Sequence, residues 1–330
     1  MALIAAAARL KHERVKMQRK PAGPAFSPLH EHVYPHEEWR MNPKITREII
    51  QAYDEYTHLT LDRRGFMEKL TKLAGSGAAA AAIMPMLASN YARAEIVPAD
   101  DPRLAISEIT YPGPDGPVKG YLAMPAEAEG ALPAVIVVHE NRGLNPHIKD
   151  VTRRLALEGF VALGVDLLSR KGGTPPSDDE AAAMFQDLDR AAVVADAVAA
   201  IAYLKGLPET NGNVGAIGFC FGGGIVNQMA VESPDLVAGV AYYGSQAAAE
   251  DVPKIKAKLL LHYAGLDERI NAGIPAYEEA LKAAGTDYTI YVYEGVNHAF
   301  NNDTSEARYD KDAATLAWTR TVDFLNASLG

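Results

Sequence analysis

Residues 214–224 read Val-Gly-Ala-Ile-Gly-Phe-Cys-Phe-Gly-Gly-Gly and contain the only cysteine of the chain, Cys220. A short apolar run passes directly into a glycine-rich turn, with Gly218 two residues before the cysteine and Gly222 two residues after it. Where a strand turns sharply into a helix, the residue at the tip is strained, and flanking side chains would collide. The pattern predicts a nucleophile elbow that carries a thiol where a hydroxyl is more usual. The alternative is a buried cysteine without a chemical role.

A nucleophilic Cys220 needs a base, because a thiol with an ordinary pKa of about 8.5 is only slightly ionised at neutral pH. In elbow enzymes, an acid and then a histidine follow the nucleophile, each on a loop after a later strand. Asp267 follows the apolar run 258–265, and His298 lies in the loop after the alternating run 288–293. We expect His298 to exchange a proton with the thiol and Asp267 to fix the imidazole tautomer.

Other histidines and acids in this part of the chain are weaker candidates. His139 precedes the nucleophile, His147 lies near a predicted helix start, and His262 lies inside an apolar strand. Asp287 and Asp303 also lie on late loops and remain alternatives for the acid. The order of residues along the chain therefore favours the loop after the last predicted strand as the source of the base.

Four segments together resemble the dienelactone hydrolase family, over essentially all of residues 100–330. They are His-Glu-Asn-Arg-Gly-Leu-Asn at 139–145, Gly-Phe-Cys-Phe-Gly-Gly at 218–223, Tyr-Tyr-Gly at 242–244 and Glu-Gly-Val-Asn-His-Ala-Phe at 294–300. The resemblance implies an α/β-hydrolase fold and a triad of Cys220, His298 and Asp267. It also implies that Glu140 holds the resting thiol by a hydrogen bond and helps to activate it when substrate arrives.

Further site residues follow from this resemblance. The backbone N–H groups of Phe221 and Asn141 would point at the developing oxyanion. Arg170 matches one of two arginines with which the family grips a substrate carboxylate, and Asn302 stands at the position of the second. Tyr243 is a third candidate for substrate binding. Because one bidentate cation is lost, the family's own substrate does not follow from the match.

Alternatives stay open for the charged residues around the predicted site. Arg142 and Arg308 lie near the site loops and would either replace the missing arginine or form surface salt bridges. Glu140 is either a partner of the site, since a lone buried carboxylate is costly to desolvate, or a solvated loop acid.

Predicted strands and helices alternate from residue 100 onward, which favours a mostly parallel twisted sheet with helices on both faces. Such sheets bind ligands beyond the carboxyl ends of their strands, where the predicted catalytic residues lie. We expect strands near 105–111, 118–124, 133–138, 160–165, 214–217, 237–242, 258–263 and 288–293, and helices near 147–158, 178–206, 221–232, 272–284 and 310–327.

Charge divides the chain into two parts of opposite sign. Residues 1–94 carry 14 Lys and Arg against 9 Asp and Glu, and residues 95–330 carry 18 against 33, a net charge of −15. The second part therefore offers no basic surface to nucleic acid or anionic lipid. It also has no glycine-rich phosphate loop and no spaced Cys/His set, so we expect no metal and no organic cofactor. Its length suits a single α/β catalytic domain.

The first part of the chain indicates an export signal. Leu-Asp-Arg-Arg-Gly-Phe-Met at 61–67 resembles a twin-arginine motif, the weakly apolar run 73–88 follows, and Ala-Arg-Ala at 92–94 is a cleavage signature. The run is too short and too rich in Gly and Ala for a stable membrane span. We expect residues 63–94 to address the protein to twin-arginine export machinery and the periplasm.

A retained helical or disordered extension on a cytoplasmic protein is the alternative. The segment before the arginine pair is 62 residues long, and Asp62 replaces the usual small hydroxyl residue. The natural start is Met1, Met17 or Met41, of which Met41 shortens that segment most.

These features predict a cysteine hydrolase of an ester or lactone that passes through an acyl thioester on Cys220 without a cofactor. A thioester or another activated carbonyl compound is the alternative substrate. A non-catalytic exported binding or scaffold protein on the same fold is the alternative class, because a fold alone does not carry function.

Overall fold

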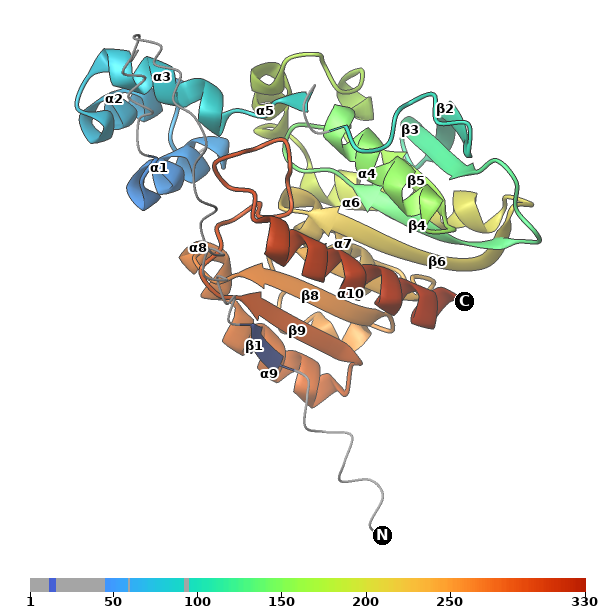
Figure 1. Ribbon diagram of the computed structural model, residues 1–330. Coiled ribbons are helices and arrows are strands. Elements are labelled where there is room, and N and C mark those ends of the chain that lie inside the picture. Colours follow the sequence, from blue (N-terminus) through green and yellow to red (C-terminus); the bar gives the residue numbers. More distant parts are fainter. Residues whose placement is uncertain (1–11, 16–44, 59, 92–94) are drawn as a thin grey trace, which may run out of the picture.

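The computed structural model describes residues 12–15, 45–58, 60–91 and 95–330 of the chain. Its centre is a twisted sheet with the strand order β9-β8-β7-β6-β4-β5-β3-β2 (Figure 1), and the short strand β1 (His12–Val15) pairs in parallel with β9. The other strands are β2 (Leu104–Gly113), β3 (Gly116–Pro125), β4 (Leu132–Val138), β5 (Val161–Val165), β6 (Thr210–Phe219), β7 (Ala238–Tyr242), β8 (Lys258–Ala264) and β9 (Tyr288–Tyr293).

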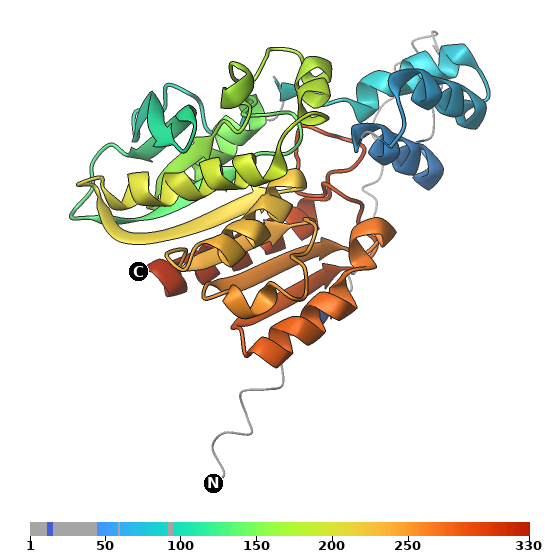
Figure 2. The same ribbon diagram turned by 180° about the vertical axis from the view of Figure 1, so that it is seen from behind.

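Helices cover both faces of the sheet (Figures 1 and 2). They are α4 (Pro146–Leu157), α5 (Asp178–Phe185), α6 (Arg190–Lys205), α7 (Phe221–Glu232), α8 (Glu268–Asn271), α9 (Ile274–Ala284) and α10 (Lys311–Leu329). Side chains of β4 alternate between the two sides: Val135 and Val137 pack with α4 and α10, while Ile136 packs with α6, α7 and α9. This two-sided burial explains why the parallel strands are continuous apolar runs.

The predicted α/β-hydrolase fold is confirmed, with local differences. The expected long helix over 178–206 is interrupted between α5 and α6, because Asp189 caps α6 by accepting hydrogen bonds from the backbone N–H groups of Ala191 and Ala192. The helix expected from residue 272 is preceded by the short α8, which Asp267 caps. Strands β2 and β3 run antiparallel at one edge, and the remaining strand pairs are parallel except for β3 with β5.

Three further helices precede the sheet and form what we call the helical segment, residues 45–91. They are α1 (Arg47–Thr57), α2 (Arg63–Ala74) and α3 (Gly77–Leu87). Each begins at a side-chain cap, formed by Thr46, Asp62 and Ser76. Their buried side chains form a small core of their own, made of Ile49, Ala52, Tyr53, Phe66, Leu70, Ala80, Ile83 and Leu87. Asp62, which is unusual for an export motif, thus has a structural role as a helix cap.

Polar contacts fasten the helical segment to the α/β part beside α5 (Figure 1). The Tyr56 hydroxyl donates to Asp179 at 2.7 Å, and the Tyr91 hydroxyl donates to Asp178 at 2.8 Å. Arg63, the first arginine of the expected export motif, forms an ion pair with the same Asp179. The helical segment therefore lies over the end of the sheet where α5 and the following loops gather.

Among the described residues, no single helix is long and apolar enough to cross a membrane. Helices α2 and α3 reach that hydropathy only as a pair, and their axes bend by 113° at the junction. The predicted cleavage site at 92–94 and the candidate starts Met1, Met17 and Met41 lie outside the described residues. The boundary expected after residue 94, and the export that depends on it, therefore stay predictions.

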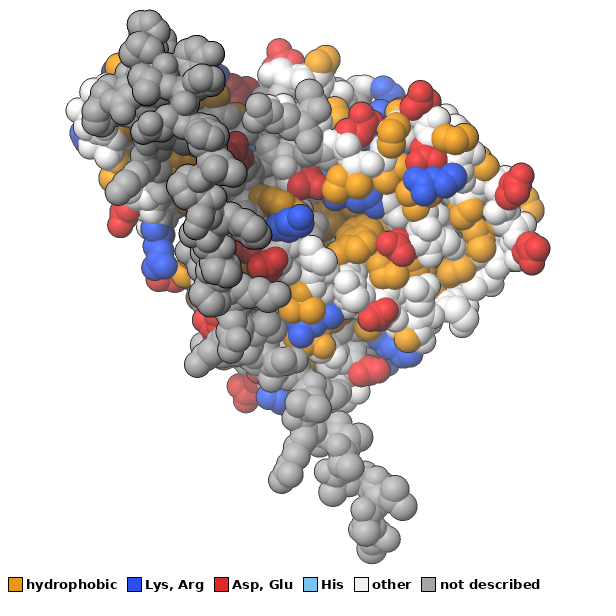
Figure 3. All heavy atoms as spheres, viewed as in Figure 1, with side chains coloured by type: hydrophobic (Ala, Val, Ile, Leu, Met, Phe, Trp, Pro, Cys, Tyr) orange, Lys and Arg blue, Asp and Glu red, His pale blue; other side chains and the backbone are white. Residues whose placement is uncertain are grey.

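Basic side chains do not gather into a patch on the face shown in Figure 3, where acidic and basic groups are interspersed. This agrees with the net charge of −15 counted for residues 95–330, 18 against 33. On this face, the surface lacks the basic stripe by which proteins bind the nucleic-acid backbone.

Phe66 offers a test of how the helical segment is held together. Its side chain is fully buried and stacks on Tyr56 with 4.9 Å between ring centroids. We expect Phe66→Ala to cost about 3–5 kcal/mol, enough to unfold a core this small. Hydrogen exchange followed by mass spectrometry should show rapid exchange in α1–α3 and unchanged protection in β4–β8. The control is Leu73→Ala, because Leu73 is 40% exposed; equal effects of both variants would contradict the packing argument.

Candidate active site

Cys220 stands at a strained turn between β6, which ends at Phe219, and α7, which begins at Phe221. Its φ of 54° and ψ of −113° are rare for a residue with a side chain. A Cβ atom on Gly218 would lie 2.1 Å from the carbonyl oxygen of Gly222, and one on Gly222 would lie 2.3 Å from that of Val138. The turn can be this tight only because both positions are glycine, as the elbow pattern requires.

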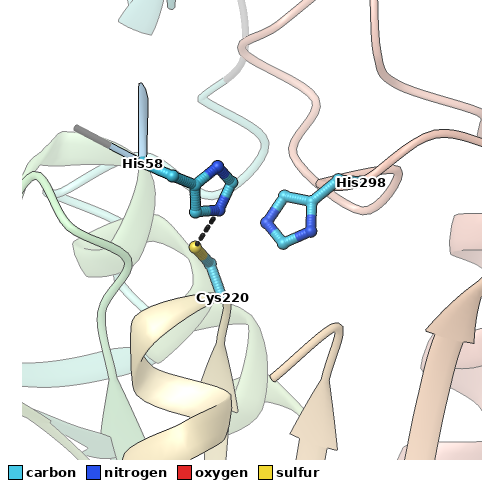
Figure 4. Close-up of side chains that lie close together, drawn as sticks. All are labelled: His58, Cys220 and His298. Carbon is cyan, nitrogen blue, oxygen red and sulfur yellow. Dashed lines mark hydrogen bonds between the residues drawn. The ribbon is translucent and has the colours of Figure 1, made fainter. Parts of the chain in front are cut away.

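The structure brings the predicted acid and base together next to the elbow. His298 Nδ1 lies 2.5 Å from Asp267 Oδ2, and both side chains are buried. The second oxygen of Asp267 accepts from the backbone N–H of Ile270 at 3.2 Å. With Nδ1 engaged, one ring nitrogen of His298 is left to face Cys220 (Figure 4). His298 Nε2 is buried with no hydrogen-bond partner among the described residues.

The competing histidines are occupied elsewhere. His139 Nδ1 contacts the Glu140 carbonyl oxygen at 2.6 Å, and its Nε2 accepts from the Leu167 N–H. His262 contacts Thr321 and Tyr293 inside the sheet, and burial lowers its pKa to about 3. The two remaining alternatives, His147 and Asp303, lie 3.1 Å apart as a pair of their own.

Electrostatics at the site favour a thiolate. Burial alone would raise the pKa of Cys220, but the positive charge that the His58 and His298 rings can carry lowers it to about 6. Burial likewise opposes a charged His298, yet Asp267 and Cys220 raise its pKa to about 10. Burial also opposes ionisation of Asp267, and the charge of His298 outweighs it, so the pKa of Asp267 is lowered. A thiolate and an imidazolium therefore coexist at neutral pH.

A histidine that the sequence pattern did not indicate completes the site. His58, the residue after α1, places Nε2 3.4 Å from Cys220 Sγ (Figure 4). Its ring meets that of His298 edge-on, with centroids 4.6 Å apart. His58 lies 162 residues before the cysteine, in a part of the chain whose motifs favoured a leader. No spacing rule connects the two residues, and only the docking of the helical segment brings them together.

Glu140 is buried, so it is not a solvated loop acid. However, the hydrogen bond recorded for the thiol goes to His58, and Glu140 instead accepts from Asn302 Nδ2 at 2.7 Å and from the Tyr243 hydroxyl at 3.5 Å. Asn302 was expected to face substrate. Its side chain is buried and holds Glu140, so it differs from that expectation because its amide is already engaged.

Arg170 is also placed differently from the expectation. Its guanidinium binds Asp196 at 2.5 Å and Asp115 at 2.6 Å, away from the residues that line the cavities at Cys220. The two carboxylates consume the donors that a substrate anion would need. Arg308, by contrast, is buried, forms an ion pair with Asp54 of α1 at 3.2 Å and lines the cavity beside the thiol.

Two cavities meet at Cys220. An open cleft of about 420 Å³ is lined by His58, Phe185, Arg190, Phe221, Tyr243 and Arg269, among others. A small internal cavity of about 30 Å³ is lined by His58, Glu140, Cys220, His298 and Arg308, among others. The first has room for a small organic molecule, and the second has room for water. Asn141 lines both cavities, and Phe221 begins α7, whose first N–H groups have no partner within the helix.

Cys220, His58 and His298 each place one nitrogen or sulfur atom within 4.8 Å of the others. This is a donor set that Zn²⁺ prefers. Arg269, however, donates to His58 Nε2 at 2.9 Å. A cation at this point would have to displace a guanidinium from the same lone pair. The arrangement suits proton transfer better than metal binding.

Comparison with known proteins agrees with this geometry. Residues 118–329 match the model of the dienelactone hydrolase family. A protein of Methylorubrum extorquens named “Putative carboxymethylenebutenolidase” is 35% identical over 236 residues, which cover 67% of this chain and 80% of the relative. A dienelactone hydrolase-like promiscuous phosphotriesterase from metagenomic libraries superimposes with a TM-score of 0.61 to 0.63 in rounded company with other family structures.

That phosphotriesterase has a TM-score of 0.63 and 26% identity, and the match covers 69% of this chain and all of that structure. The helical segment, including His58, lies outside the range 118–329 that the family model matches. The match of the α/β part over most of its length shows that the chain belongs to the dienelactone hydrolase family.

Proposed function

We propose that this member of the family hydrolyses an ester or lactone with Cys220 as its nucleophile, through an acyl thioester. The observation that carries the proposal is the sulfur at a strained elbow beside an imidazole that a buried carboxylate orients. This arrangement suits nucleophilic catalysis at a carbonyl carbon, because the base lies beside the nucleophile and a third group fixes the base.

The first half of the cycle would acylate the enzyme. His298 holds the proton taken from the thiol, and the Cys220 thiolate attacks the carbonyl carbon. The oxyanion that forms would be stabilised by the backbone N–H groups of Phe221 and Asn141. Collapse breaks the bond to the leaving oxygen, which takes the proton from His298. In a lactone, this oxygen stays attached to the acyl chain as a hydroxyl group.

The second half would release the acid. His298, now neutral, takes a proton from water, and the resulting hydroxide attacks the thioester carbonyl carbon. Collapse breaks the carbon–sulfur bond and returns the thiolate, which pairs again with the protonated ring of His298. Asp267 supports each charged state of the ring without taking up the proton itself.

The open cleft supports a substrate that carries an anionic group. Arg190 and Arg269 line this cleft, and neither forms a salt bridge within the described part of the chain. Arg190 donates only to the Ser245 hydroxyl, at 3.3 Å. Phe185, Phe221 and Tyr243 supply apolar surface between the arginines and the thiol. A small lactone or ester with a carboxylate would place its charge on the arginines and its carbonyl at Cys220.

The ionisation of the thiol gives a direct test. The labelling rate with iodoacetamide should rise with pH to a plateau, with its midpoint near the pKa of about 6 of Cys220, because only the thiolate reacts. Below that pH the thiol is protonated, so labelling slows. Mass spectrometry of the labelled peptide measures the rate. Labelling and Cys220→Ala should both abolish hydrolysis of an activated aryl ester. A midpoint near the ordinary value of about 8.5, with hydrolysis unaffected, would favour a non-catalytic role.

Removal of a cleft arginine tests the substrate class. We expect Arg190→Ala to raise KM about tenfold for a lactone that carries a carboxylate, because a charge-assisted contact is lost. The KM for the methyl ester of the same compound, which lacks the charge, should stay unchanged. Steady-state kinetics on this matched substrate pair measure the effect. An equal rise for both compounds would mean that Arg190 shapes the cleft without binding the anion.

A further inference from the structure

The ring of His58 is held firmly in place at the site. Its Nδ1 lies 2.6 Å from the carbonyl oxygen of Asp54, one turn earlier in α1. The Asn141 amide donates to the carbonyl oxygen of Thr57, directly before His58. Asp54 also pairs with Arg308, which lies over the ring of Tyr53 at 5.0 Å. Several contacts with the α/β part thus fix the end of α1 relative to the nucleophile.

The partners of His58 determine where its lone pair lies. A carbonyl oxygen can only accept, so Nδ1 must carry the hydrogen that Asp54 receives. Arg269 approaches Nε2 at 2.9 Å, and a guanidinium can only donate. Nε2 therefore presents its lone pair toward the space at Cys220 Sγ and Arg269, in the neutral form of the ring.

The two imidazoles frame one small volume above the sulfur. One nitrogen of His58 and one of His298 lie within 4.8 Å of each other and of Sγ. A molecule about 2.8 Å from each nitrogen would span that separation with two hydrogen bonds. The internal cavity of about 30 Å³ borders both rings and Cys220, and it is large enough for water.

His58 does not close the site. The cleft of about 420 Å³ still reaches Cys220, and His58 forms part of its wall together with Asn141 and Phe221. An inhibitory plug would instead fill the space that the substrate needs. The ring is placed beside the path to the sulfur, on the side that also borders the internal cavity.

We infer that His58 positions the hydrolytic water during deacylation. In the acyl-enzyme, water would donate one hydrogen bond to His58 Nε2 and the other to His298 Nε2, so that its oxygen lone pair points at the thioester carbonyl carbon. His298 takes the proton, the carbon–oxygen bond forms, and the carbon–sulfur bond breaks to release the acid and the thiolate. His58 keeps its own proton count throughout. This inference rests on the proposed cysteine mechanism.

The test compares acylation with deacylation in the full chain, with p-nitrophenyl acetate as the probe. In His58→Ala, we expect a burst of one nitrophenol per enzyme followed by a steady state about 10- to 100-fold slower than in the wild type, because an oriented water is lost. The burst rate, which reports acylation, should change by less than about threefold. Intact-protein mass spectrometry during turnover should show acetylated enzyme. His58→Gln, which keeps a hydrogen-bond acceptor, should recover part of the loss.

Arg63→Ala is the control for loosened docking, because it removes the ion pair of α2 with Asp179 and leaves His58 unchanged. It should keep the wild-type ratio of the two rates. Equal losses in both steps of His58→Ala would indicate a purely structural role, faster acylation would indicate an obstructing ring, and unchanged kinetics would make His58 a spectator. Each of these results overturns the inference. Cys220→Ala separates the two proposals, since hydrolysis that survives in it refutes the cysteine mechanism itself.

Discussion

The close approach of two backbones at the elbow is the constraint on which the site depends. Gly222 lies so near the end of β4 that a Cβ atom would overlap the carbonyl oxygen of Val138. This contact fixes the start of α7 against the centre of the sheet and forces Cys220 into its positive-φ conformation. The thiol is then presented at the carboxyl ends of the strands, where the loops after β8 and β9 deliver Asp267 and His298. Tight packing here thus precedes any question of chemistry.

Local patterns were sufficient to predict the α/β part of the molecule. Apolar runs such as 258–263 are strands because both faces of the sheet are covered, and the glycines around Cys220 are required by sterics. Acid and histidine could be placed because each follows a strand whose end is fixed by the sheet. The interruption of the helix expected over 178–206 was missed, since the cap at Asp189 lies within a stretch that is otherwise compatible with a helix.

Side-chain partners were less predictable than backbone positions. Arg170 and Asn302 lie at the expected points of the chain, yet Arg170 binds Asp196 and Asn302 binds Glu140. These choices depend on carboxylates contributed by other elements, which a linear pattern does not reveal. His58 illustrates the same limit over a longer range, because its approach to the thiol depends on how a separate three-helix core docks. The motif at 61–67 meanwhile has a second explanation, in which Asp62 caps α2 and Arg63 pairs with Asp179.

The attachment of His58 to the first helices links the integrity of the enzyme to a peripheral piece of the fold. The α/β part carries the nucleophile, acid and base within residues 220–298, while the helical segment contributes one ring through a short stretch after α1. If His58 serves the hydrolytic step, a protease that severed the chain between this ring and β2 would leave a molecule able to capture one acyl group and slow to let it go. Such a clipped form would be a single-use scavenger of reactive esters instead of a recycling enzyme.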